Sequence, residues 1–177
     1  MFADGSRARA NAVRRAHPSP QREGLRKLRV IADFQLGPRA GKVIFTEGTR
    51  IEYSVRTGRI RRAIFRGRVL ATLIPATGLL ALTPLAAHRF AKAFPPPRQR
   101  VVVGREAAEF VSQGRSVFAR HIIDVDQELR PNDEVIVTDR NDRILAVGKA
   151  LLSPEEMLSF KIGVAVKTRA GKRSRSS

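Results

Sequence analysis

The sequence predicts an α+β protein in which a small α+β unit is followed by a small closed β-barrel. Short apolar runs separated by glycine, a few clear helix-start signals and the central run Pro95–Pro97 all indicate this organisation. Consecutive prolines cannot continue a helix and form a stiff connector, so we place the boundary between the units there. The predicted units are residues 24–97 and 98–171, and basic tails flank them at residues 1–23 and 172–177.

The first unit opens with a predicted helix over Leu25–Leu36, in which leucine and alanine recur at helical spacing until Gly37. Thr83 followed by Pro84 is typical of a helix start, so a second helix should bury Phe90 and Phe94. Between the helices we expect short strands joined by glycine turns. These strands span Lys42–Phe45, Arg50–Val55, Arg59–Phe65, Arg68–Ile74 and Leu79–Leu82.

The second unit should contain short strands and two short helices. The first helix is expected at Arg105–Ser112 with Gly114 just beyond its end, and the second begins at the capping box Ser153–Glu156. Short strands with so little helix favour closure into a barrel over an open sheet. The predicted strands are Arg100–Val103, Val117–Val125, Glu134–Thr138, Arg143–Leu151 and Gly163–Arg169.

The composition points to a polyanion as partner and excludes several kinds of chemistry. The net charge is +18 and the pI is about 11.7, which favours RNA or DNA. There is no cysteine, so disulfides, thiolate zinc sites and cysteine nucleophiles are excluded. His17, His88 and His121 lack metal-ligand spacing. No nucleophile triad or nucleotide-binding motif is present, so we expect no cofactor, no metal and no catalysis by this chain.

The pattern of apolar residues argues against a membrane protein. The longest uncharged run, Val69–His88, is interrupted by Pro75 and Pro84, and it should therefore form strands and turns. Residues 1–23 are rich in arginine and lack the apolar stretch of a secretory signal. We expect a cytoplasmic protein that has no membrane partner.

Acidic residues gather in the second unit without forming a recognisable catalytic pair. They lie at predicted strand ends and turns, where aspartate is common for backbone reasons, so we expect structural roles. These residues are Asp124, Asp126, Asp133, Glu134, Asp139 and Asp142.

Gly114–Phe118, Val147–Ala150 and Gly163–Val166 contain glycines in a characteristic order relative to the predicted helices and strands. Through these motifs the stretch Val101–Arg169 resembles the PUA domain, a small RNA-binding barrel. In PUA domains a glycine after the first helix lets the backbone approach an RNA strand.

A second resemblance rests on the motifs Ile31–Gly37, Thr57–Arg61 and Pro97–Val102. Through them the stretch Leu25–Pro97 resembles the domain that precedes PUA in archaeal tRNA-guanine transglycosylase, the archaeosine enzyme. The catalytic barrel of that family, with its aspartates and cysteine-bound zinc, has no counterpart in this sequence, so the resemblance implies no activity for this chain.

The resemblance implies that the ligand is structured RNA, with tRNA docked by its acceptor stem and 3′ end beside the Gly114 loop and the last strand. It further implies the RNA-binding subunit of a split archaeosine transglycosylase, which would work with a separate catalytic subunit. The alternative is a ribosome-biogenesis or translation factor that binds rRNA. The candidate RNA-binding residues are Gly114, Arg115, Ser116, Phe118, Arg120, Lys161, Gly163, Lys167, Arg169, Arg59, Arg61 and Arg62.

Overall fold

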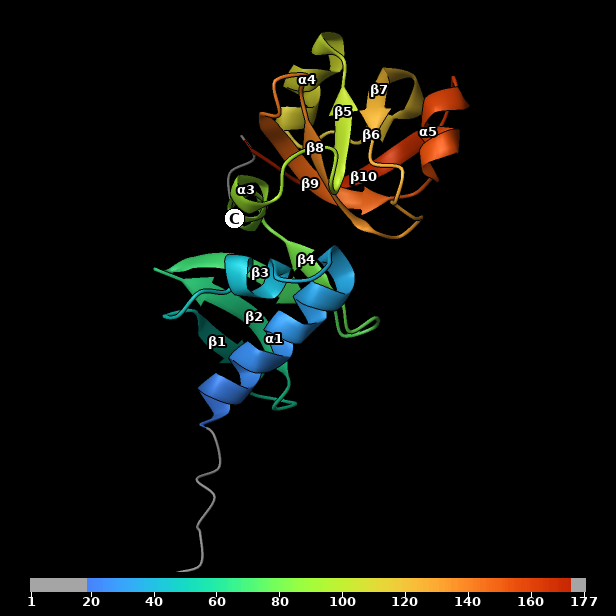
Figure 1. The fold of residues 1–177 in the computed structure, drawn as a ribbon. Helices are drawn as coiled ribbons and strands as arrows, with labels where there is room; N and C mark the ends of the chain where they lie inside the picture. The colour runs from blue at the N-terminus through green and yellow to red at the C-terminus, as the bar shows by residue number, and fades with distance from the viewer. Residues whose placement is uncertain (1–18, 173–177) are drawn as a thin grey trace, which may run out of the picture.

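In the computed structural model, which describes residues 19–172, the chain forms a small α/β layer below a β-barrel (Figure 1). The lower part is an antiparallel meander of four strands in the order β1-β2-β3-β4, with α1 lying across it. Its elements are α1 (Pro20–Leu36), α2 (Ala40–Ile44), β1 (Arg50–Tyr53), β2 (Ile60–Phe65), β3 (Arg68–Leu73), β4 (Leu80–Leu82) and α3 (Pro84–Ala93).

The upper part is a six-stranded sheet in the order β6-β10-β9-β8-β5-β7, in which only the β5–β8 pair is parallel. The outer strands β6 and β7 are joined in the chain by a single 3₁₀ turn, so the sheet is a nearly closed barrel. Its elements are β5 (Arg100–Val103), α4 (Arg105–Ser112), β6 (Val117–Phe118), η1 (Ala119–His121), β7 (Ile122–Val125), β8 (Glu134–Thr138), β9 (Ile144–Ala150), α5 (Pro154–Ser159) and β10 (Val164–Gly171). The α+β class and the barrel are confirmed.

Three helix boundaries follow the predicted chemistry. The Ser153 side chain accepts a hydrogen bond from the Glu156 N–H, and the Glu156 carboxylate accepts one from the Ser153 N–H, which completes the capping box. The Thr83 hydroxyl oxygen accepts the Ala86 N–H and caps α3. Gly37 ends α1 at a φ of 94°, which glycine adopts without steric cost.

The predicted strand Lys42–Phe45 is wrong, because this segment belongs to the short helix α2. A short apolar run does not distinguish a strand from a helix by its period. Contact with α1 decides the outcome: the Gly41 N–H donates to the Asp33 carboxylate over 2.7 Å, and a Cβ at Gly41 would lie 2.2 Å from the Arg29 carbonyl oxygen. Only glycine permits that approach.

Two further boundaries differ from the predictions. The predicted strand Val117–Val125 is interrupted by η1, which divides it into β6 and β7. Helix α1 starts at Pro20, so the end of the predicted tail is helical; Gln21 exchanges two hydrogen bonds with the backbone of Ile51 on β1. The rest of that tail, residues 1–18, and residues 173–177 lie outside the described residues. No helix within residues 19–172 has the length and apolarity that a membrane span needs.

The hydrophobic core of the lower part extends onto β8 and β9 of the barrel sheet, while a second buried cluster fills the barrel itself. Phe90 and Leu82 of the lower part belong to the same buried cluster as Ile136 of β8 and Val147 of β9. Helix α3 lies between the two parts and packs against both β3 and β9 (Figure 1). Burial of these side chains, worth roughly 1.5–3 kcal/mol each, ties the two parts into one body.

A buried carboxylate joins the two parts at their centre. Glu134 of β8 has a side chain that is 4% exposed, and it accepts two hydrogen bonds from Arg169 of β10 over 2.6 and 2.9 Å. The same carboxylate accepts the N–H of Leu82 on β4 over 2.8 Å. Burial raises the pKa of the Glu134 carboxyl, while the Arg169 guanidinium and the Leu82 N–H oppose that rise.

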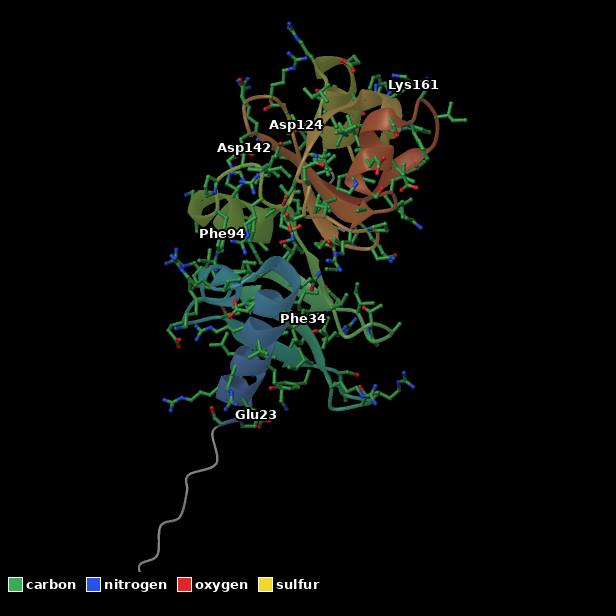
Figure 2. All side chains as sticks on the ribbon, turned by 45° about the vertical axis from the view of Figure 1, so that its right-hand side comes forward. Glu23, Phe34, Phe94, Asp124, Asp142 and Lys161 are labelled. Atoms are coloured by element: carbon green, nitrogen blue, oxygen red, sulfur yellow. The ribbon has the colours of Figure 1, made fainter. Side chains whose placement is uncertain are left out.

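A second ion pair, between buried Arg100 and half-buried Asp142, holds the connector in place. The fully buried Arg100 of β5 makes a bidentate contact with Asp142 over 2.8 and 3.2 Å. Its guanidinium also donates to the carbonyl oxygens of Phe94, at the end of α3, and Arg98. Phe94 and Asp142 lie on the same side of the molecule, near the point where the lower part meets the barrel (Figure 2). The residues on either side of the proline run are therefore held by the barrel.

We predict that Arg169→Met lowers the free energy of unfolding by about 3 kcal/mol, because it leaves the Glu134 carboxylate buried and unpaired. Breaking a buried ion pair costs about 3–5 kcal/mol, and we expect the low end of this range because Arg169 is partly exposed. Denaturant unfolding measures the change. Lys167→Met, an exposed change on the same strand, is the control and should cost little. Equal stabilities of the two variants would contradict this role for the ion pair.

Candidate nucleic-acid interface

The Gly114 loop is the C-terminal cap of α4. The Gly114 N–H donates to the Val111 carbonyl oxygen over 2.9 Å, and the Arg115 N–H donates to that of Phe110 over 3.1 Å. This is a Schellman motif, whose C′ residue needs a positive φ, and Gly114 has a φ of 100°. Gly114, which also carries the resemblance to PUA domains, is thus required by the local geometry of the helix cap. It directs the chain from α4 toward β6.

The end of β10 supports this loop from below. An ideal Cβ placed on Gly171 would lie 2.4 Å from the Ser112 carbonyl oxygen and 2.5 Å from the Gly114 nitrogen. Two glycines therefore allow the loop and the last strand to touch through their backbones.

A groove opens between α4 and the β6–η1 segment. It has a volume of 470 Å³ and is lined by Glu106, Ala107, Phe110, Val111, Arg115, Ser116, Val117, Phe118, Arg120 and His121. Four predicted site residues meet here: Arg115, Ser116, Phe118 and Arg120. The Phe118 ring is 44% exposed, and the Arg120 guanidinium lies 5.9 Å from its centroid.

Two residues of this groove were missed from the sequence. Phe110 is 60% exposed, although it lies on a helix whose apolar face is otherwise buried. An aromatic side chain outside the buried stripe of α4 was the available signal. His121 accepts a hydrogen bond from Arg120 over 3.2 Å, and its other ring nitrogen lies 3.4 Å from the Glu106 carboxylate.

Glu106 is the acidic residue of the groove. Its pKa is lowered, first by a hydrogen bond from its own backbone N–H and then by His121, while burial acts in the opposite direction. These contacts favour the ionised form of the Glu106 carboxylate.

Of the other predicted residues of the barrel, two lie at or near the groove, one is exposed further along β10 and one pairs with Glu134. The Gly163 carbonyl oxygen accepts the Ala119 N–H over 3.0 Å, so Gly163 adjoins the groove, and Lys161 is exposed just before it (Figure 2). Lys167 is exposed further along β10. The Arg169 guanidinium donates to the Glu134 carboxylate, so this side chain helps to join the barrel to the lower part.

The predicted arginines of the lower part lie apart from this groove. Arg59 directly precedes β2, and Arg61 and Arg62 both reach Glu52 of β1, at 3.7 and 3.0 Å. Glu52 is the cross-strand partner of Arg62, so the sheet register brings the two charges together.

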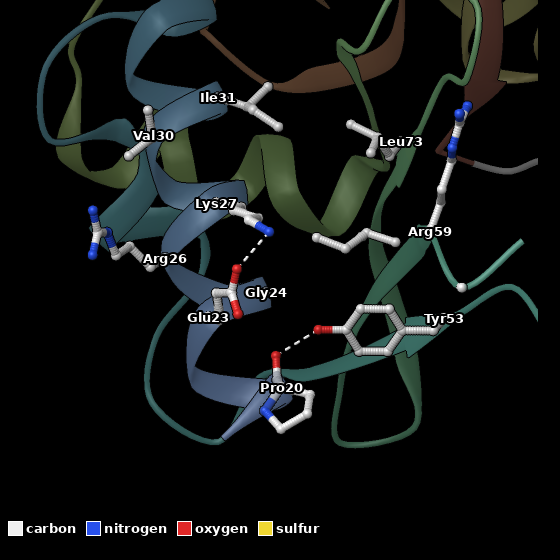
Figure 3. Close-up of a pocket in the computed structure, with 12 residues that line it drawn as sticks. Pro20, Glu23, Gly24, Arg26, Lys27, Val30, Ile31, Tyr53, Arg59 and Leu73 are labelled. Carbon is white, nitrogen blue, oxygen red and sulfur yellow. Dashed lines mark hydrogen bonds and ion pairs between the residues drawn. The ribbon is translucent and has the colours of Figure 1, made fainter. Parts of the chain in front are cut away.

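Arg59 lines a separate hollow of 710 Å³ between α1 and the β1–β2 hairpin (Figure 3). Its walls are mainly apolar, with Val30, Ile31 and Leu73 among them. Two polar contacts lie within it: Lys27 pairs with Glu23, and the Tyr53 hydroxyl donates to the Pro20 carbonyl oxygen (Figure 3).

The acidic residues have the structural roles that their positions predicted. Asp126 accepts the N–H groups of Gln99 and Glu128, and Asp139 accepts those of Asn141 and Arg143. Glu134 differs, since it sits in the interior rather than in a turn. Within residues 19–172 there is no group of three or more histidine and acidic side chains that could hold a metal ion.

Comparison with known families identifies both parts. Residues 26–97 match the patch-forming domain C2 of tRNA-guanine transglycosylase, and residues 99–172 match the PUA domain. The chain contains a C2 domain followed by a PUA domain. The resemblance found in the sequence is confirmed, and the groove described above belongs to the PUA domain.

The C2–PUA chain is homologous to the C-terminal part of archaeal tRNA-guanine(15) transglycosylases. It is 43% identical to the enzyme of Methanothermobacter thermautotrophicus over 84% of this chain and 23% of that protein. It is 40% identical to the enzyme of Thermococcus kodakarensis over 86% of this chain and 26% of that protein. The chain thus spans about a quarter of the length of these relatives.

Solved structures share the fold over nearly the whole described chain. A hypothetical protein from Pyrococcus horikoshii aligns with a TM-score of 0.68 at 20% identity, over 86% of this chain and 92% of that one. A conserved PUA domain protein from Thermoplasma acidophilum aligns with a TM-score of 0.60 at 17% identity, over 87% and 91%. The arrangement of a small α/β layer and a barrel therefore also occurs in proteins of about this length.

We predict that Gly171→Ala displaces the Gly114 loop and destabilises the fold by about 1–3 kcal/mol, because the added methyl group meets two backbone atoms. Amide hydrogen exchange should become faster across residues 112–116. Gly163→Ala is the control: its methyl group enters open space and only its positive φ is strained. Faster exchange across residues 112–116 in the control alone would contradict the proposed support of the loop by β10.

Proposed function

We propose that this chain is a tRNA-binding protein that supplies substrate binding to a separate transglycosylase catalytic chain. The observation that carries the proposal is the homology itself, which runs through both C2 and PUA. Those relatives are tRNA-guanine(15) transglycosylases. A C2–PUA chain of this kind would contribute binding and orientation, and the partner would contribute the chemistry.

The chemistry of the PUA groove suits an unpaired RNA end. Phe110 and Phe118 present exposed rings on its two walls, and exposed aromatic rings stack on unpaired bases. Arg115 and Arg120 add guanidinium groups, which bind phosphate through two parallel hydrogen bonds. The base edges of an A-form stem are poorly accessible, so the domain should bind backbone and an unpaired end rather than read sequence.

The described residues also favour a non-catalytic role. Asp126 and Asp139 accept backbone N–H groups, and Asp142 and Glu134 pair with arginine, so these four carboxylates are engaged in structural contacts. We therefore assign the chain to binding and assign base exchange to a partner.

We predict that affinity for tRNA is electrostatic. If about six to ten phosphates are neutralised, affinity should fall by about three to five decades between about 50 and 200 mM salt on the duplex-DNA calibration. Fluorescence anisotropy with a labelled tRNA transcript measures this, and Phe118→Ala should weaken binding at every salt concentration without changing the slope. Binding that does not change with salt would exclude backbone recognition.

We predict that this chain alone exchanges no guanine in tRNA, but raises the kcat/KM of a separate transglycosylase catalytic chain by about tenfold or more, because bound substrate is positioned for reaction. A radiolabelled-guanine exchange assay with the purified chains measures both quantities. The variant Phe110→Ala/Phe118→Ala should reduce the gain. Exchange by this chain alone, or no effect on the partner, would contradict the assignment.

A further inference from the structure

Two adjoining hollows lie where α3 meets the end of β10, away from the groove of the PUA domain. Their volumes are 470 and 340 Å³, and both are lined by His88, Lys92 and Lys172. We call them together the junction groove. Four segments form it: the start of β3, helix α3, the β8–β9 turn and the residue after β10. Its basic members are Arg68, His88, Arg89, Lys92, Arg143 and Lys172.

The junction groove keeps its positive charge. Asp142 is the carboxylate among the described residues that line it, and both of its oxygens are bound by Arg100. Arg143 lies 3.9 Å from Asp139, a long contact. Within residues 19–172, no carboxylate lies within ion-pair distance of Arg68, Lys92 or Lys172. These three exposed cations are therefore available to an anionic ligand.

One cation of the groove is held in place by the fold. The Arg89 guanidinium lies 4.0 Å from the centroid of the Phe65 ring and donates to the Ile44 carbonyl oxygen over 2.8 Å. Arg66 approaches the same ring at 5.3 Å. Burial lowers the pKa of the Arg89 guanidinium and the nearby charge of Arg66 lowers it further. A bound anion would relieve this repulsion.

The junction groove adjoins the Gly114 loop through two consecutive residues. Gly171 touches the backbone of Ser112 and Gly114, as its missing Cβ shows, and Lys172 follows it directly. The Lys172 N–H donates to the Leu145 carbonyl oxygen over 2.7 Å, which fixes the point at which the side chain leaves the barrel. A strand that contacts the Gly114 loop can thus continue onto Lys172 and then along α3.

We propose that the junction groove binds the phosphate backbone of the RNA whose end is held beside the Gly114 loop, with Arg68, Lys92 and Lys172 contacting successive phosphates. This inference rests on the proposed tRNA binding and extends it from the PUA domain onto α3 and the C2 sheet. An extended polyanion fits better than a small anion because the cations come from separate segments along two adjoining hollows rather than around one buried point.

The test compares two triple variants that remove the same charge. Arg68→Gln/Lys92→Gln/Lys172→Gln removes the cations of the junction groove. Arg22→Gln/Arg50→Gln/Arg130→Gln removes three exposed arginines outside both grooves. Affinity for a tRNA transcript is measured by anisotropy at several salt concentrations. The junction variant should bind at least about tenfold more weakly than the control variant near 0.1 M salt, with a salt slope smaller by about three.

A charge-retaining variant, Arg68→Lys/Lys92→Arg/Lys172→Arg, should keep most of the wild-type affinity, and thermal unfolding of all variants checks that they remain folded. Equal losses in the junction and control variants, with clear binding by the wild type, would overturn the junction groove and leave the proposed function standing. Failure of the wild-type protein to bind tRNA would overturn both.

Discussion

The Glu134 carboxylate is the interaction on which the arrangement of the two domains depends. It lies in the interior, binds the backbone of β4 in the C2 domain and pairs with Arg169 of β10, two strands away in the PUA sheet. A carboxylate removed from water is tolerable only with such partners, so the two domains must sit in the position that supplies them. The apolar core around it stabilises the contact between the domains but does not fix their relative orientation. The hydrogen-bonded ion pair has a required geometry and therefore does fix it.

A fixed junction has consequences for binding. The junction groove consists of segments from both domains, and its shape exists only while α3, β3 and β10 keep their relative positions. Arg100 contributes to this rigidity because it connects the end of α3 to the β8–β9 turn through Phe94 and Asp142. The chain therefore presents a continuous surface instead of two independent modules, and little ordering is required when a long ligand binds.

The local parts of this fold could be predicted from the sequence, because their causes are local. The cap at Ser153, the helix start at Thr83 and the stop at Gly37 each depend on residues within one helical turn. Helix α2 could not be predicted, since its conformation is decided by contact with α1. The pairing of Glu134 with Arg169 and Leu82 joins positions 35 and 52 residues away, and no periodic pattern records such a pair.

The candidate site was predictable to a similar degree. The resemblance located Gly114, Phe118 and Arg120, which the structure brings into one region. The number of arginines alone did not identify the RNA-binding residues, because Arg62 and Arg169 form ion pairs with carboxylates of other strands. These pairs become visible only when the strands are placed in the sheet. The junction groove could not be predicted, because its basic residues come from four segments that are distant in the sequence.

Recovery of the RNA bound to this protein in cells tests the central claim most directly. Ultraviolet cross-linking, purification of the full chain and sequencing of the attached RNA identify the ligand without any assumed substrate. The Phe110→Ala/Phe118→Ala variant serves as the matched control for the PUA groove. Our account predicts that tRNA dominates the recovered RNA, with cross-links toward the acceptor end, and that the variant loses this enrichment. Recovery of ribosomal RNA in its place would contradict it.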